Sequence, residues 1–87
     1  EFSRERDDGY TKGELAAAAE AYAGDASTAI LEGKTTTTKF LTSQWPLARK
    51  WWKPTDPRRD LVKAGALIAA EIERLDRAAA KAAGGAA

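Results

Sequence analysis

The chain has 87 residues and contains no cysteine, no histidine and no methionine. The lack of cysteine excludes disulfides, thiolate catalysis and cysteine-ligated zinc or iron–sulfur sites. The lack of histidine excludes Ser–His–Asp and Cys–His catalysis and removes the commonest transition-metal ligand. Because no methionine opens the chain, we expect that it is trimmed or that Glu1-Phe2 is a cloning scar. Hydrolytic chemistry would therefore have to rest on carboxylates with Mg²⁺ or Mn²⁺.

Long apolar runs are also lacking. No run approaches the ~18–20 residues that span a bilayer, and no signal peptide is evident. We therefore expect no membrane partner and a reducing compartment such as the cytosol. Alanine supplies 20 residues and buries little area, so large core-forming side chains are few. A core this small makes a partner chain plausible.

Charge is balanced overall, with 14 Lys+Arg against 13 Asp+Glu, but it is unevenly placed. Residues 1–32 carry three basic and eight acidic side chains, whereas residues 33–63 carry eight basic and two acidic ones. Residues 64–87 carry three of each. A chain that is bipolar in this way suits self-association or docking on an anion.

The pattern predicts an all-α fold: a short helix and a long C-terminal helix, packed antiparallel and joined by an aromatic-rich irregular segment. Thr11 and Glu14 have the spacing of a capping box and predict that the short helix begins at about Lys12. Gly24 predicts its end, after Ala23. The side of this helix that should face the long helix carries apolar residues three or four positions apart, including Leu15, Ala19 and Tyr22.

The long helix is expected to begin at Asp56-Pro57, an N-cap followed by a favoured first residue, and to run to about Ala83. A seam with heptad-like steps runs along it, formed by Leu61, Gly65, Ile68, Ile72 and Leu75. We expect this seam to pack on the short helix. A glycine inside a helix costs roughly 1 kcal/mol relative to alanine, so Gly65 should mark a close approach of the two helices.

Other parts of the chain are less determined. We expect one helical domain over residues 1–83, with a loose arm at 1–10 and a flexible tail at 84–87. The β-branched threonines within 34–42 leave a short strand or an extended loop open. Residues 47–53 are expected to form one or two helical turns.

Aromatic and basic side chains are interleaved before and at the start of the long helix. This candidate binding set is Trp45, Trp51, Trp52, Lys53, Arg58 and Arg59. Rings among cations can stack on bases and neutralise phosphates, which makes a nucleotide or a nucleic acid one candidate partner. The alternative, which we favour, is that the tryptophans cover the open end of a thin core while the cations stay in water.

Carboxylates on the two helices are the remaining chemical candidates. If Asp60 and Glu71 faced carboxylates of the first helix, such as Glu14, across a pocket, the set could bind Mg²⁺ and act in catalysis. The alternative, which we favour, is that Asp60 complements the helix dipole, Glu14 is a cap and Glu71 belongs to a solvated charged face. No metal or cofactor is expected under this alternative.

Two blocks of the chain together resemble a family of small bacteriophage and prophage proteins. The blocks are RDDGYTKGELAAAAEAYA at 6–23 and WWKPTDPRRDLVKAGALIAAEIERLDR at 51–77, and they cover about half of the chain. Arg6 and Tyr10 stand where the family pattern has histidines. The pair Glu73 and Asp76 is similar to the Glu-x-x-Asp pairs of all-α, MazG-like nucleoside triphosphate pyrophosphohydrolases.

The resemblance implies a phage- or prophage-encoded protein of the host cytosol or the virion. With no convincing catalytic set and a bipolar charge pattern, we expect it to act by binding a host factor, a virion component or a defence protein. We expect a homo-oligomer or a complex with another protein, in which Leu67, Leu75 or the tryptophans are covered by the partner. The alternatives are a Mg²⁺-dependent nucleotide-binding or pyrophosphohydrolase-like protein and a nucleic-acid-binding module.

Overall fold

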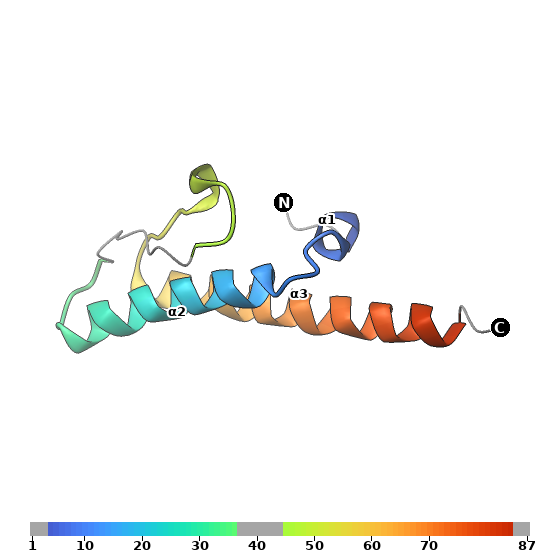
Figure 1. Cartoon of the computed structure of the whole chain (residues 1–87). Helices are drawn as coiled ribbons and strands as arrows, with labels where there is room; N and C mark the ends of the chain where they lie inside the picture. Colours follow the sequence, from blue (N-terminus) through green and yellow to red (C-terminus); the bar gives the residue numbers. More distant parts are fainter. Residues whose placement is uncertain (1–3, 37–44, 85–87) are drawn as a thin grey trace.

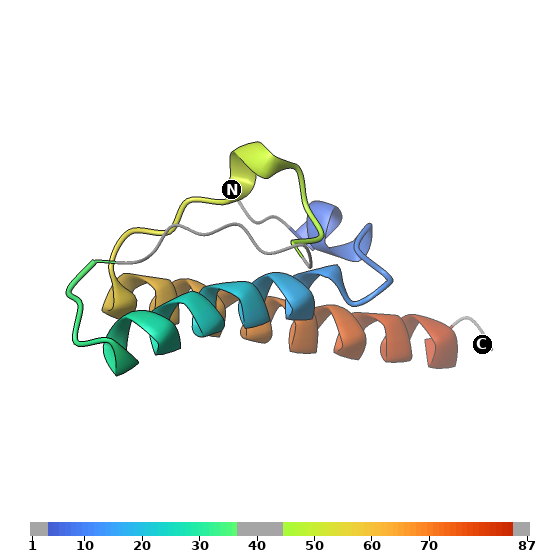
Figure 2. The same ribbon diagram turned by 60° about the vertical axis from the view of Figure 1, so that its left-hand side comes forward.

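The computed structural model of the chain describes residues 4–36 and 45–84. These residues form the helices α1 (Arg4–Asp8), α2 (Glu14–Leu31) and α3 (Pro57–Gly84) and a short 3₁₀ helix, η1 (Arg49–Trp51). No strand occurs in this part of the chain. The long helix α3 packs antiparallel against the shorter α2, with α1 and η1 on one side of the pair (Figures 1 and 2). The prediction of an all-α fold is therefore confirmed.

Two expectations fall mainly outside the described residues. Residues 34–36 are loop, and the rest of the segment for which a strand was considered, 37–42, is not described. Of the expected tail, Gly84 still belongs to α3, and 85–87 are not described. The expected helical turns before Pro54 are present as η1.

The start of α2 differs from the capping-box prediction. Gly13 is the N-cap, with a left-handed φ of 82° that glycine adopts without steric cost, and the helix begins at Glu14. Glu14 Oε1 accepts the backbone N–H of Lys12 at 2.6 Å. The glutamate does reach back to the backbone, but no side chain caps the helix, so the expected role of Thr11 is wrong.

The end of α2 lies beyond Gly24, where the prediction placed it. Ala26 and Ala29 are fully buried after this glycine, and their packing against α3 offsets its helix-breaking tendency. The helix closes in a Schellman motif, in which the N–H of Lys34 donates to the carbonyl of Ala29 at 2.8 Å. Gly33 supplies the left-handed residue of this motif, with a φ of 71°.

The helix α3 begins and ends as predicted. Asp56 Oδ1 accepts the N–H of Arg59 at 2.9 Å, as an N-cap should, and Pro57 is the first helical residue. At 1.5 Å per residue, the 28 residues of α3 span ~42 Å and the 18 residues of α2 span ~27 Å. The C-terminal end of α3 consequently extends past α2 (Figure 1).

The core between α2 and α3 is built largely from small side chains. Its buried members are Leu15, Ala18, Ala19, Tyr22, Ala64, Leu67 and Ala70. The predicted packing of Leu15, Ala19 and Tyr22 is thereby confirmed. Three partly buried side chains of the connecting segment pack against this core, namely Trp45, Leu47 and Trp52. The aromatic segment thus covers a helix pair that is too thin to bury much surface alone.

The prediction that α3 packs on α2 through the seam of Leu61, Gly65, Ile68, Ile72 and Leu75 is wrong. A second row with the same steps runs one residue earlier along α3, and its members are buried: Asp60, Ala64, Leu67, Glu71 and Arg74. Most of the polar groups in this row find partners inside the fold. Glu71 and Arg74 pair at 2.6 Å, and Asp60 accepts the N–H of Thr55 at 2.9 Å.

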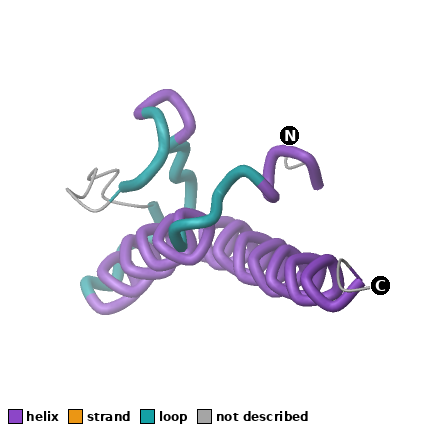
Figure 3. Tube along the Cα trace, turned by 45° about the vertical axis from the view of Figure 1, so that its right-hand side comes forward, coloured by secondary structure: helices purple, strands orange, loops and turns teal. Residues whose placement is uncertain are grey.

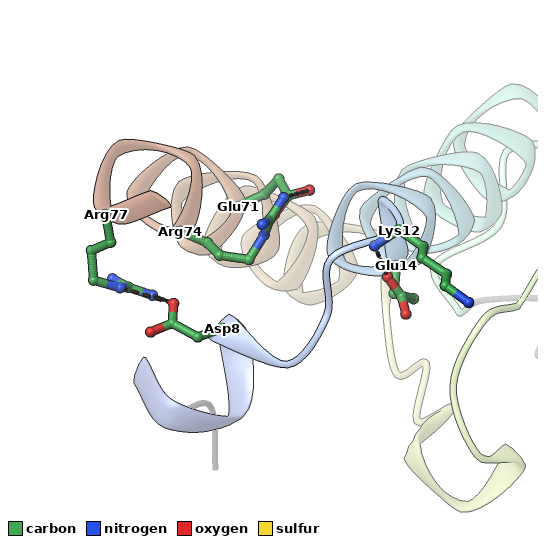
Figure 4. A network of polar contacts seen from close by, with 6 residues as sticks. All are labelled: Asp8, Lys12, Glu14, Glu71, Arg74 and Arg77. Atoms are coloured by element: carbon green, nitrogen blue, oxygen red, sulfur yellow. Dashed lines mark hydrogen bonds and ion pairs between the residues drawn. The ribbon is translucent and has the colours of Figure 1, made fainter. Parts of the chain in front are cut away.

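The described part of the expected loose arm, residues 4–10, is folded against the rest of the chain. Residues 4–8 form α1, which packs on α3 beyond the start of α2. Asp8 Oδ1 accepts from Arg77 Nη2 at 2.8 Å and from Arg77 Nε at 3.0 Å (Figure 4). This charge-assisted pair anchors α1, and Asp7 beside it is buried.

Candidate functional site

A long apolar surface lies exposed on α3. We call it the α3 stripe, and it consists of Leu61, Gly65, Ile68, Ile72 and Leu75. Its four aliphatic side chains are between 46% and 54% exposed, whereas Leu67 of the adjacent row is 1% exposed. The expectation that Leu67 is left for a partner is therefore wrong, while Leu75 is exposed as that hypothesis requires. The stripe covers ~21 Å of helix.

The α3 stripe lies on the side of the molecule that α1 and η1 leave uncovered. Arg77 binds α1 and follows Leu75 by two residues, which places the two side chains about 200° apart around the helix. In Figures 1 and 3, α1 and η1 lie on the same side of the helix pair, and no described segment covers the opposite side. Continuous apolar rows of this kind mark contact sites for other chains.

The apolar surface continues onto the end of α2. Ile30 and Leu31 are exposed there, and a shallow pocket joins them to Leu61 of the α3 stripe. The other residues that line this pocket are Ala23 and Ser27. The exposed surface therefore spans both helices of the pair rather than one isolated row.

Gly65 lies in the middle of the α3 stripe. A Cβ atom added there would meet nothing within 4 Å, so no close approach to α2 requires a glycine. The predicted helix contact at Gly65 is wrong, because the row that faces α2 is the one that contains Ala64. The fold described so far therefore leaves the glycine without a structural reason.

Two of the three tryptophans belong to an aromatic cluster over the core. The rings of Trp45 and Trp52 lie 4.9 Å apart, and those of Tyr22 and Trp52 are also 4.9 Å apart between centroids. The Tyr22 hydroxyl donates to the carbonyl of Trp51 at 3.2 Å and accepts the N–H of Lys53 at 3.1 Å. This cluster attaches the connecting segment to α2, which is the structural role that we favoured.

The third tryptophan, Trp51, is exposed and lies close to two cations. The guanidinium carbon of Arg6 is 5.1 Å from the Trp51 ring centroid, and Lys50 Nζ is 5.4 Å from it. A pocket beside Trp51 is lined by Arg6, Tyr10, Tyr22, Trp45, Leu47, Trp51 and Leu67. Arg6 was missed by sequence reasoning because the chain brings it from α1, and only the tertiary contact places it here.

The remaining basic candidates do not converge on this pocket. Arg58 and Arg59 are exposed in the first turn of α3 and do not line it. The carbonyl of Lys53 accepts from Lys63 Nζ, and the Lys63 ammonium lies 5.3 Å from the Tyr22 ring centroid. The structure therefore joins the tryptophans to α1, and leaves the α3 arginines at a separate place.

Asp60 is fully buried between the helices, opposite a second carboxylate. Its Oδ1 accepts the Thr55 N–H, and no donor among the described residues reaches Oδ2. Burial raises the pKa of Asp60, the Thr55 N–H opposes this, and the hydrogen-bonding contact with Asp25 raises it further. Asp25 was not among the predicted residues, although its position three residues after Tyr22 and four before Ala29 places it on the buried side of α2.

The other carboxylate candidates are occupied elsewhere. The expectation that Glu71 lies on a solvated charged face is wrong, because its side chain is buried with that of Arg74. Glu71 accepts from Arg74 Nε at 2.6 Å and from Nη2 at 3.2 Å, and Glu14 holds the backbone of Lys12 (Figure 4). Asp60 and Glu71 are 11 residues apart, which is ~16 Å along α3, so one Mg²⁺ cannot bind both. Within residues 4–36 and 45–84, no three acidic side chains are grouped to hold a metal ion.

Two further findings bear on function. No helix in the described part of the chain combines the length and the apolar character needed to cross a bilayer. Comparison of the chain with protein-family models, with curated proteins and with solved structures finds no match. The functional argument therefore rests on the exposed surfaces themselves.

Proposed function

We propose that this protein is a small helical interaction protein that acts by binding another protein chain through the α3 stripe. The observation that carries the proposal is the exposure of the stripe, because α3 turns its more polar row toward α2 and its more apolar row outward. A chain that is selected only to fold alone gains by burying the apolar row instead. The resemblance to phage proteins supports a role on a host factor, in the virion or against host defence.

The surface is large enough to support binding. Fully burying a Leu or Ile side chain is worth about 1.5–3 kcal/mol, so covering the half-exposed members of the stripe together with Ile30 and Leu31 contributes on the order of 5–10 kcal/mol per chain. Association costs about 4–15 kcal/mol in lost freedom of motion. The two quantities are similar in size, which favours a complex of moderate affinity rather than a permanent one.

Site-specific photo-cross-linking in bacterial cells tests this proposal. Replacing Ile72 by a photoreactive benzoylphenylalanine should give discrete protein adducts after irradiation, because the side chain at this position is covered by a partner. The same replacement at Gly24, which is exposed on α2, should give none. Equal adducts from both positions, or none from position 72 in a folded variant, would show that the stripe binds no protein.

A second candidate function rests on a separate observation, the placement of Arg6 and Lys50 around the exposed ring of Trp51. A single-stranded nucleic acid could stack a base beside this ring while the two cations neutralise its phosphates.

Oligonucleotide titration followed by tryptophan fluorescence tests this second candidate. Trp51→Ala should weaken the binding of a single-stranded oligonucleotide by about tenfold, since base stacking is worth about 1–3 kcal/mol. The affinity of the unaltered chain should fall steeply with salt. Lys81→Ala, at the far end of α3, is the control and should leave the affinity unchanged. Binding that is indifferent to Trp51→Ala would contradict the site.

A further inference from the structure

We infer that the chain that covers the α3 stripe is a second copy of this protein, packed antiparallel about a twofold axis near Ile68. This inference rests on the proposed function and names its partner. The result would be a four-helix arrangement in which two α3 helices lie against each other and the α2 helices lie outside them. Three observations support it: the register of the stripe, the position of Gly65 and the flanking charges.

The stripe is self-complementary in this register. Leu61 and Leu75 each lie seven residues from Ile68, on opposite sides. A twofold axis at Ile68 therefore places Ile68 against itself and Leu61 against Leu75 of the partner subunit. A closed dimer of this type uses the same patch on both copies, which is the commonest symmetry of soluble oligomers.

The same register of the two α3 helices also explains why position 65 is a glycine. It lies three residues before Ile68, and Ile72 lies four residues after it, so the antiparallel pair sets Gly65 against Ile72 of the partner subunit. Inside one chain the glycine faces open space and only weakens the helix. In the pair, the missing Cβ leaves room for the bulky isoleucine. The residue that the fold of one chain does not explain is therefore explained by the packing of two chains.

Charge favours the antiparallel arrangement over the parallel one. Arg58 and Asp76 are both exposed and are 18 residues apart, which is five full turns, so they lie on one line along α3. Antiparallel packing about Ile68 brings Arg58 within a turn of Asp76 of the partner subunit, twice by symmetry. Parallel packing in register would form no such pair, because Arg58 and Asp76 would stay ~27 Å apart along the two helices.

The size of the surface sets the expected strength. The overlap of two α3 helices in this register is ~35 Å long, and with a helix width of ~11 Å it amounts to about 400 Å² per chain. A total of about 800 Å² lies below that of stable, specific interfaces. Ile30 and Leu31 adjoin Leu61 and extend the contact toward the C-terminal half of the second α3. We therefore expect a dimer that forms reversibly at micromolar concentrations.

Sedimentation of the purified full chain from about 1 to about 500 µM is the first part of the test, because oligomer stability depends on concentration. We expect the mass to rise from that of one chain to that of two. Gly65→Ala should raise the melting temperature at the lowest concentration by about 4 °C or more and yet weaken the dimer by about tenfold. Gly24→Ala, the matched control in open space on α2, should raise the melting temperature and leave the dimer unchanged.

Disulfide trapping tests whether the two α3 helices pack antiparallel. Because the chain has no cysteine of its own, an introduced cysteine can form a disulfide only with another introduced cysteine. Ile68→Cys should form a disulfide-linked dimer under oxidation. Leu61→Cys should form one only when mixed with Leu75→Cys. Efficient linkage of Leu61→Cys to itself would overturn the antiparallel register.

The failures of the two proposals are distinguishable. A monomer at every concentration would overturn the second copy as partner. Photo-cross-linked adducts at position 72 with a different protein would still support the proposed function in that case. A dimer that Gly65→Ala does not weaken would overturn the assigned close approach of the two α3 helices.

Discussion

Leu67→Ala is expected to lower the free energy of unfolding by about 3 kcal/mol, which is a large part of the stability of a domain this small. Leu67 is 1% exposed and packs with Leu15 and Tyr22 in a core made mostly of alanine. Most of its buried neighbours in the core are alanines, whose short side chains cannot fill the cavity that the substitution leaves. Urea unfolding followed by circular dichroism measures the loss.

Leu75→Ala is the matched control, since it makes the same substitution on the same helix, on the outward row. Because Leu75 is half exposed, the loss should stay below about 1 kcal/mol when it is measured at low concentration, where any dimer is dissociated. The comparison separates the two rows of α3 directly. If Leu75→Ala cost as much as Leu67→Ala in the monomer, the packing of α2 and α3 would have to be through the stripe.

Features encoded by neighbouring residues could be predicted from the sequence. Asp56 and Pro57 specify the start of α3 through a local hydrogen bond and a fixed φ, and the structure places the helix start there. The all-α class follows from the spacing of Leu15, Ala19 and Tyr22 in the same way. Each of these signals acts over a few residues and needs no knowledge of the rest of the chain.

The choice between the two rows of α3 could not be predicted from the spacing of apolar residues. Both rows repeat with the same steps, and the stripe is the more apolar, so spacing alone selects the wrong one. The contact that spacing does not reveal is the ion pair between Glu71 and Arg74, which lets two charged side chains of the polar row be buried together. The same rule that places apolar residues inside a protein also applies to interfaces, and one chain alone does not tell the two apart.

The candidate sites also include some features that neighbouring residues encode and others that depend on tertiary contacts. Trp45 and Trp52 are in the aromatic cover that the composition suggested, whereas Arg6 reaches Trp51 only because α1 folds back. Gly65 was correctly marked as unusual, but it was assigned to the wrong helix contact. The sequence shows that a glycine lies inside a helix, but only the tertiary structure shows which surface that glycine faces.

Asp60→Asn is expected to stabilise the protein at pH 7 by about 1–2 kcal/mol, although it removes the charge that the sequence places near the positive end of the α3 dipole. The amide oxygen can still accept the Thr55 N–H, and the amide nitrogen can donate to Asp25, where the carboxylate of Asp60 has no proton to give. Lys63 is the cation that favours the ionised form of Asp60, and its attraction is the smaller effect. Asp60→Ala, which leaves the Thr55 N–H without an acceptor, should instead destabilise the fold.

Asp60 makes the stability of the folded chain depend on pH. Since burial and Asp25 raise the pKa of Asp60 above its ordinary 3.8, the folded chain binds a proton at a pH where the unfolded chain has lost it. The contribution of Asp60 to stability is therefore greatest below pH 3.8 and decreases as pH rises through the folded-state pKa. Asp60→Asn removes this dependence, so its advantage over the native chain should shrink as the pH is lowered toward 4. Thermal unfolding between about pH 3.5 and 8 measures it, and an advantage that grew on acidification would mean that Asp60 is stabilised in its ionised form.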